Sequence, residues 1–528
     1  METTRRNFAE AAPLLHDFVI LLASIRHDGK SLVEIAGEEI SKPSGRIASL
    51  AVVIILVVAL AGLGSVVVNA LAESSWGMFT IAATIPIALL MGVWMFRFRA
   101  GKTGEATVIG VILLFAAVVG GRYVPGSAIG QWLLFSKKGL TVILALYGFI
   151  ASVLPVWLLL SPRDYLSSIM KLGVVALLAL GIIMVAPNLH MPAFTSFVHG
   201  GGPVIPGTLY PYLFITIACG AISGFHSLVS SGTTPKMLNK ESDMLMISSG
   251  AMLAEAMVSI LALLAASSLL PLDYFRINVP ADKLALFMDQ LHHMGFTTSN
   301  LTGLSQEVGE NIQGRTGGAV SLAVGMAQIF SSVPGLKGLM SYWYHFAIMF
   351  EALFILTTID AGTRIGRFIL QEAFGHVYKP LGKTNSWAGN LAASGLFVIM
   401  WGYFIYTGSV ATIWPMFGAA NQLLAAIALV VGTSYLINQG KLRYAWTTAI
   451  PMVFVGVTTI AAGILNMKNI YIPQLFVEDT WFQGLVNLLL TLIIMTSVIY
   501  IFIEACRRWI RVIRTETVSK EPVLSFEK

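Results

Sequence analysis

The sequence predicts an all-α polytopic membrane protein, and three observations support that prediction. Of its 528 residues, 56% are hydrophobic and only 11% are charged, whereas soluble domains carry about 25% charged residues. Apolar runs recur along the whole chain at the length of about 20 residues that crosses a bilayer. Lys and Arg gather in both terminal segments and in short loops between the runs. This pattern, and with it the net charge of +6, marks the cytoplasmic side of a membrane protein and does not indicate nucleic-acid binding.

Thirteen apolar runs are candidates for membrane helices. The run at 318–334 is the weakest, because it is short, rich in small residues and flanked by glycines. The basic terminal segments place both termini in the cytoplasm, so the number of crossings must be even. We therefore expect about twelve crossings, with 318–334 as a re-entrant helix. The runs are 47–71, 78–96, 106–121, 139–160, 168–187, 209–230, 246–270, 318–334, 340–361, 387–408, 411–433, 446–466 and 481–505.

The runs divide the chain into five segments. We expect a cytoplasmic N-terminal segment at 1–46, which contains a truncated helix, and a cytoplasmic tail at 506–528. Membrane helices occupy 47–270 and 318–505, and 271–317 forms an outer loop that serves as a lid. The histidine pair in that loop, His292 and His293, is not expected to bind a metal, because adjacent helical residues point in different directions.

The stretch ACGAISGFHSLVSSGTTPK at 218–236 combines glycines, hydroxyls and a histidine at the end of an apolar run. Irregular, polar backbone at membrane depth is typical of a broken helix that lines a cavity. Packing of small residues between helices is the alternative interpretation. We expect substrate contacts from Ser223, Gly224, His226 and Ser227. We expect the helix break and gate at Gly220, Gly232, Thr233, Thr234 and Pro235.

A second break is predicted in LPVWLLLSPRDYLS, residues 154–167. Pro155 removes an intrahelical hydrogen bond near the middle of a span. Because broken helices often form the substrate site of transporters, we expect Pro155 and Trp157 to contact the substrate. A kink without any ligand is the alternative.

Two amides lie inside the span that contains WPMFGAANQLLAAIAL, residues 414–429. Asn421 and Gln422 are candidates for substrate contact, and hydrogen bonding between helices is the alternative.

Three acids lie within apolar runs. A carboxylate at membrane depth is costly and usually functional, so Glu351 is a candidate proton carrier. Asp360 is a second candidate, although an ordinary pair with Arg364 one helical turn away is the alternative. Glu255 is expected to pair with a neighbour.

The sequence contains no motif that would indicate an enzyme in place of a transporter. The sequence contains no phosphate-binding loop, no H-E-x-x-H, no G-x-S-x-G and no dinucleotide fingerprint. We therefore predict a protein that is not an enzyme, has no cofactor or metal, and binds a small-molecule substrate and a coupling ion within the lipid bilayer.

These stretches, together with RHDGKSLVEI at 26–35, resemble the carbon starvation protein A family of bacterial inner-membrane transporters. The resemblance extends from about residue 16 to the C-terminal region. It implies a multi-pass protein of the inner membrane that imports peptides or pyruvate with protons during nutrient starvation. It also implies a core of two inverted five-helix repeats.

One departure from the family pattern affects the site. Family members usually begin further upstream, with a membrane helix that has a histidine pair and a glycine–proline break. We expect that first broken helix of the core to be missing here. The alternative to a transporter is therefore a non-transporting membrane remnant or a nutrient sensor.

Overall fold

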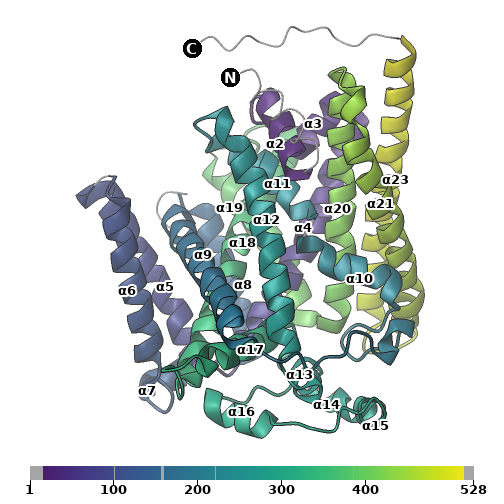
Figure 1. Cartoon of the computed structure of the whole chain (residues 1–528). Helices are drawn as coiled ribbons and strands as arrows, with labels where there is room; N and C mark the ends of the chain where they lie inside the picture. Colours follow the sequence, from purple (N-terminus) through teal and green to yellow (C-terminus); the bar gives the residue numbers. More distant parts are fainter. Residues whose placement is uncertain are drawn as a thin grey trace. The chain divides into compact units, whose positions relative to one another are not determined.

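The computed structural model describes residues 16–99, 101–155, 160–220, 222–383, 386–408 and 410–515. The described residues form helices joined by turns and loops, with no strand among them, so the all-α prediction is confirmed. The chain divides into two compact units whose helices are labelled in Figure 1. Unit 1 comprises 1–59, 209–257 and 414–528, and unit 2 comprises 60–208 and 258–413.

Unit 1 is assembled from three separate stretches of the chain. It holds two short N-terminal helices, two half-helices and the C-terminal helices. Three further helices have residues in both units: α4 (Lys42–Leu71), α12 (Met244–Ser267) and α20 (Val410–Asn438). The helices of unit 1 alone are α2 (His16–Arg26), α3 (Leu32–Glu39), α10 (Leu209–Ile217), α11 (Gly224–Gly232), α21 (Trp446–Asn466), α22 (Ile472–Gln474) and α23 (Trp481–Thr515).

Unit 2 contains six long helices and a group of short ones. Its long helices are α5 (Ser75–Val93), α6 (Thr103–Gly121), α8 (Lys137–Val153), α9 (Leu160–Val185), α18 (Met340–Val377) and α19 (Trp387–Thr407). The short ones are α7 (Ala128–Trp132), α13 (Pro271–Asn278), α14 (Ala281–Leu284), α15 (Met288–His293), α16 (Leu301–Val308) and α17 (Ala319–Ser332).

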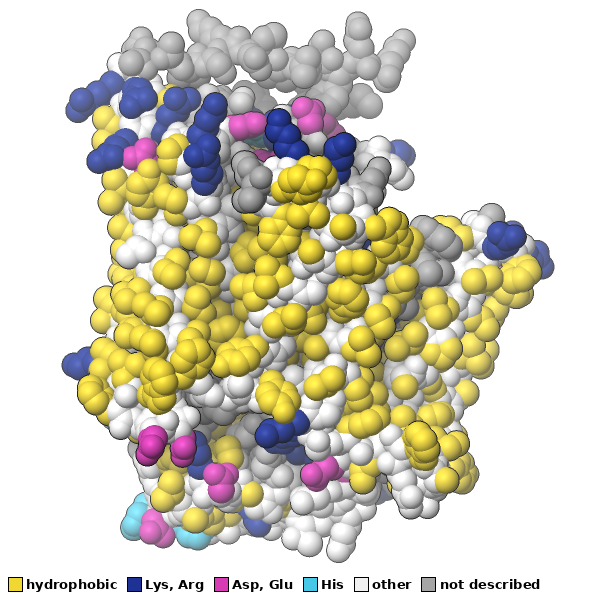
Figure 2. All heavy atoms as spheres, turned by 180° about the vertical axis from the view of Figure 1, so that it is seen from behind, with side chains coloured by type: hydrophobic (Ala, Val, Ile, Leu, Met, Phe, Trp, Pro, Cys, Tyr) yellow, Lys and Arg dark blue, Asp and Glu magenta, His cyan; other side chains and the backbone are white. Residues whose placement is uncertain are grey.

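Ten helices of the described chain are long and apolar enough to cross a membrane. Their outward surfaces are largely hydrophobic, as Figure 2 shows for one face. The prediction of a polytopic membrane protein is thus confirmed. The other three apolar runs form α8, with 17 residues, the interrupted pair α10 and α11, and α17, with only 14 residues. The count of twelve crossings stays a prediction.

Several helices of unit 2 begin at a serine N-cap. The hydroxyls of Ser74, Ser127, Ser136 and Ser386 each accept a hydrogen bond from the backbone N–H three residues later. An N-cap of this kind satisfies a donor that the helix leaves unpaired. In each case that third residue is glycine.

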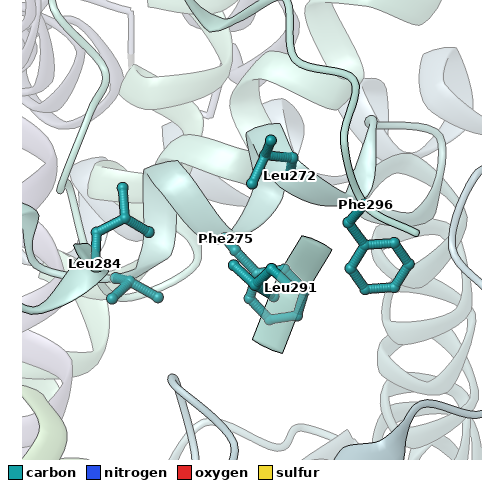
Figure 3. Close-up of a cluster of buried hydrophobic side chains, with 6 residues drawn as sticks. Leu272, Phe275, Leu284, Leu291 and Phe296 are labelled. Atoms are coloured by element: carbon teal, nitrogen blue, oxygen red, sulfur yellow. The ribbon is translucent and has the colours of Figure 1, made fainter. Parts of the chain in front are cut away.

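The expected outer loop at 271–317 folds into helices α13 to α16. Apolar side chains from α13, α14, α15 and the segment after α15 form a small hydrophobic core (Figure 3). Because this core is built from the loop's own residues, the segment is a folded layer of unit 2. Its position outside the membrane stays a prediction. The core residues are Leu272, Phe275, Val279, Leu284, Leu291 and Phe296.

Candidate functional site

The polar stretch of unit 1 is a broken helix. Helix α10 ends at Ile217, a 3-10 turn covers Ala218–Gly220, and α11 begins at Gly224. Helix α11 ends at Gly232, and a second 3-10 turn, Thr234–Lys236, starts with Thr234 and Pro235. The interruption leaves backbone N–H and C=O groups without helical partners.

Glycine is required where α11 meets α20. A Cβ at Gly224 would lie 2.2 Å from the carbonyl oxygen of Asn421 and 2.8 Å from the backbone nitrogen of Ala425. The backbones of the two helices are therefore in direct contact, and no larger residue fits without displacement. Gly418 of α20 similarly faces the carbonyl oxygen of Ile215 on α10, at 2.7 Å from its ideal Cβ.

The two amides of α20 satisfy the polar groups of this break. Oδ1 of Asn421 accepts a hydrogen bond from the backbone N–H of Phe225 at 3.0 Å, and its Nδ2 donates to Oγ of Ser223 at 3.1 Å. Nε2 of Gln422 donates to the carbonyl oxygen of Ile222 at 3.0 Å. Asn421, Gln422 and Ser223 thus form the hydrogen bonds between helices that were the alternative to substrate contact.

His226 is held between two carboxylates. Its Nδ1 lies 3.1 Å from Oδ2 of Asp17 on α2, and its Nε2 lies 2.6 Å from Oε2 of Glu255 on α12. A neutral imidazole carries only one N–H, whereas the imidazolium can donate toward both carboxylates. Asp17 also contacts Nδ1 of His16 at 2.7 Å. The expected pairing of Glu255 is confirmed, and both ring nitrogens of His226 already face protein groups.

The serine hydroxyls of α11 bind backbone groups of unit 1. Oγ of Ser227 donates to the carbonyl oxygen of Gly224, one turn earlier in α11. Oγ of Ser231 accepts a hydrogen bond from the backbone N–H of Leu32 at 3.1 Å. Oγ of Ser24 in turn donates to the carbonyl oxygen of Ser231 at 3.1 Å. These bonds fix α11 against α2 and α3.

His27 of the RHDGKSLVEI stretch forms a charged cluster with Glu39 at the end of α3. Nε2 of His27 lies 2.9 Å from Oε1 of Glu39, and its Nδ1 lies 2.7 Å from the carbonyl oxygen of Ala23. The hydrogen bond to Glu39 raises the pKa of His27 above its usual value, although burial opposes the charge. Asn438 at the end of α20 donates to the carbonyl oxygen of Glu39 at 2.9 Å, which links the cluster to that helix.

The predicted break at Pro155 lies in unit 2. Helix α8 ends at Val153, and Leu154 is extended, as expected for a residue that precedes proline. Helix α9 begins at Leu160, and Trp157 lies outside the described residues. The position of α8's end agrees with the break predicted from Pro155.

Two arginines of α18 bind the carbonyl groups that this break leaves unpaired. Nη2 of Arg364 donates to the carbonyl oxygens of Ala151 and Leu154, at 2.8 and 2.9 Å. Nη1 of Arg367 donates to the carbonyl oxygen of Ser152 at 2.7 Å. A guanidinium group therefore supplies the cap that a helix C-terminus needs.

Asp360 pairs with α9 and not with its own helix. Its Oδ2 lies 3.2 Å from Nη1 of Arg163 and accepts a hydrogen bond from the hydroxyl of Tyr147. The alternative of an i,i+4 pair with Arg364 is wrong, because that guanidinium is engaged with the end of α8. Both members of the Arg163–Asp360 pair are only 1% exposed, so the ion pair is buried.

Glu351 lies in the same helix as Asp360, without such a partner. It is half-buried, and the described residues include no hydrogen-bond or ion-pair partner for it. The predicted residues thus fall into two groups. Unit 1 brings together those of α11 and α20, and unit 2 holds Pro155, Glu351 and Asp360.

Two site residues escaped the sequence argument. Asp17 lies in the N-terminal segment, outside the predicted spans, yet an acid inside the apolar stretch HDFVILLAS is itself a signal of function. Arg163 is not among the predicted site residues, yet it lies in the first turn of α9 and is fully buried.

Comparison with known proteins gives consistent matches. A family model described as "Carbon starvation protein CstA" matches residues 11–462. The chain is 44% identical to the peptide transporter CstA of Bacillus subtilis over 514 residues, which cover 97% of this chain and 83% of that protein. It is 43% identical to the pyruvate/proton symporter BtsT of Escherichia coli over 490 residues, 86% of this chain and 68% of that protein. It is 47% identical to the peptide transporter CstA of Campylobacter jejuni over 470 residues, which cover 86% of this chain and 67% of that protein.

Proposed function

The chain belongs to the carbon starvation protein CstA family, and we propose that it is a proton-coupled importer of short peptides or pyruvate. It is a membrane transporter and not an enzyme, as the names of its relatives indicate. Coupling to protons, induction under nutrient starvation, insertion in the bacterial inner membrane and cytoplasmic termini belong to the proposal. The names of the relatives include both substrates, so both are tested below.

The observation that carries the proposal is the position of His226 between Asp17 and Glu255 in a broken helix. The three side chains form a continuous line of groups that can bind a proton. An imidazole ring can bind a proton at one nitrogen and release one from the other, so it can pass a proton between two neighbouring carboxylates. We therefore assign His226 to proton coupling, and not to direct substrate contact as the sequence suggested.

The start of α11 supports binding of a negatively charged substrate group. The N-terminus of a helix carries a partial positive charge, and half-helices in transporters direct such ends toward anionic groups of the substrate. Pyruvate and the carboxyl end of a peptide both satisfy this requirement. Asn421 fixes the backbone at Phe225, and in this proposal it positions the half-helix.

The acids of unit 2 take different roles. The charge of Asp360 is balanced by Arg163, and its carboxylate accepts a hydrogen bond from the hydroxyl of Tyr147. We therefore assign Asp360 a structural role. Glu351 has no such partner among the described residues, and it remains a candidate for a second proton site.

Uptake by the purified chain in proteoliposomes tests the proposal. Labelled pyruvate and a labelled dipeptide are offered separately, each with and without an inward proton gradient. Accumulation that requires the gradient and is abolished by an uncoupler is the expected result. If neither compound accumulates under either condition, the chain is a non-transporting member of its family.

The variant His226→Ala tests the role of the histidine. We expect gradient-driven uptake to fall at least about tenfold with unchanged expression, because the line of protonatable groups is interrupted. The matched control is His292→Ala, which removes an exposed histidine of α15. Uptake by His226→Ala equal to that of the control would assign His226 to helix packing.

A further inference from the structure

Unit 2 contains a cavity whose lining includes several charged and amide side chains, far in sequence from the broken helix of unit 1. Its volume is about 500 Å³, within the range of about 300–1,000 Å³ typical of small-molecule sites. The junction of α4 and α5, the segment around α7 and the loop after α16 surround it. The residues used below are Glu73, Gln131, Leu134, Lys137, Glu310, Gln313 and Arg315, all of which line the cavity.

The floor of this cavity is a set of charges that satisfy one another. The carboxylate of Glu310 accepts hydrogen bonds from the hydroxyl of Ser74, from Nε2 of His345 at 3.0 Å and from Nη1 of Arg315 at 3.2 Å. Burial raises the pKa of Glu310, but the hydrogen bond and charge of His345 and the charge of Arg315 outweigh it and hold that pKa below the usual value. Glu310 is thus an anion that already accepts hydrogen bonds from side chains of unit 2.

His345 anchors the floor within unit 2. Its ring is fully buried and stacks on Trp76, with 3.7 Å between ring centroids. Its Nδ1 lies 2.7 Å from the carbonyl oxygen of Ser341, which only accepts, so that nitrogen donates. His345 therefore ties Glu310 to α5 and α18.

The walls carry one carboxylate and one ammonium without protein partners. Glu73 and Lys137 are both exposed, and neither side chain has a hydrogen bond or ion pair with any described residue. Glu73 has a φ of 58°, an unusual conformation for a residue other than glycine, and such backbone is concentrated at functional sites. Its backbone N–H donates to the carbonyl oxygen of Phe135 at 3.1 Å, which fixes the turn.

We propose that this cavity binds a short zwitterionic peptide, with the amino group at Glu73 and the carboxylate at Lys137. The exposed amide of Gln131 and the half-buried amide of Gln313 are available to the peptide bond. A simple monoanion such as pyruvate has no amino group to pair with Glu73 and is repelled by that carboxylate. The site is separate from the broken helix, so the proposal goes beyond the proposed transport mechanism.

Protection of an introduced thiol tests this proposal in the full chain. Leu134→Cys places a thiol on the wall of the cavity, in a background that also carries Cys219→Ser and Cys506→Ser. Labelling by a maleimide is measured with a dipeptide, the N-acetylated dipeptide or pyruvate present. We expect only the free dipeptide to slow labelling. Leu286→Cys, an exposed position on the segment between α14 and α15, serves as the unprotected control.

Charge variants locate the two ends of the peptide. Glu73→Gln and Lys137→Met are each expected to raise the dipeptide concentration for half-protection about tenfold, equivalent to about 1.4 kcal/mol. The control Lys138→Met removes the adjacent lysine, whose ammonium lies over the Tyr406 ring, and should change nothing. Equal protection by the N-acetylated peptide, absence of protection, or an equal effect of Lys138→Met would overturn the proposal. Labelling requires no gradient, so its outcome is independent of the uptake assay.

Discussion

Replacing Arg163 by methionine should destabilise unit 2 strongly. In Arg163→Met the carboxylate of Asp360 stays buried, and among the described residues the hydroxyl of Tyr147 is the one hydrogen-bond donor left to it. Removal of one member of a buried ion pair costs about 3–5 kcal/mol, because the remaining charge is neither paired nor hydrated. Both side chains are 1% exposed, so little relaxation toward solvent is available to lower this cost.

The cost belongs to the isolated charge, and removing that charge should restore stability. The triple variant Arg163→Met, Asp360→Leu and Tyr147→Phe replaces all three polar groups by apolar ones of similar size. Substitutions of this kind are often neutral or stabilising, and the phenylalanine avoids an unpaired hydroxyl, which would cost about 1–3 kcal/mol. We expect the triple variant to unfold with a free energy close to that of the parent.

Reversible unfolding in mixed detergent and SDS micelles, followed by far-UV circular dichroism, measures these free energies. The matched control is Arg507→Met, which breaks the pair with Glu504 on the surface of α23, where the arginine side chain is 69% exposed. An exposed pair is worth about 0–1 kcal/mol. If Arg163→Met costs no more than Arg507→Met, or if the triple variant is as unstable as the single one, the buried-charge argument is refuted.

Three further predictions use the same unfolding assay or the uptake assay. Gly224→Ala should cost about 1–3 kcal/mol, because its Cβ would overlap the backbone of α20, whereas Gly232→Ala, with open space around its Cβ, should be tolerated. The pKa of His27 is higher in the folded chain than in the unfolded chain, so its contribution to stability is complete below pH about 6.5 and is lost as the pH rises through the folded value; His27→Gln should remove that part of the pH dependence, and an unchanged profile would exclude it. Glu351→Gln should abolish gradient-driven accumulation but leave substrate exchange intact, and retained accumulation would exclude Glu351 as a proton carrier.

The class of the protein and the places where its helices break could be predicted from local sequence. Low charge and repeated apolar runs indicate membrane helices, and ten of the thirteen runs form uninterrupted helices long enough to span. The glycines around residue 220 and the proline at 155 predict breaks because each acts on its own backbone. These effects do not depend on distant parts of the chain.

The partners of the polar side chains could not be predicted in the same way. Arg163 and Asp360 are separated by 197 residues, and Ser223 and Asn421 by 198. Local spacing favoured a pair between Asp360 and Arg364, because residues four apart are neighbours on a helix. The carbonyl groups at the end of α8 compete for that guanidinium, and this competition depends on tertiary packing that no single motif specifies.

The two breaks follow the same physical rule, and the rule separates capping residues from candidate ligand-binding ones. Each break leaves backbone groups without helical partners, and side chains of another helix bind them. Asn421 and Gln422 do this for α11, and Arg364 and Arg367 do it for α8. A polar residue inside a span is therefore not evidence of a ligand until its protein partners are known. By that criterion the amides of α20 serve to cap the broken helix. Glu351 has no partner among the described residues, so it stays a candidate proton carrier.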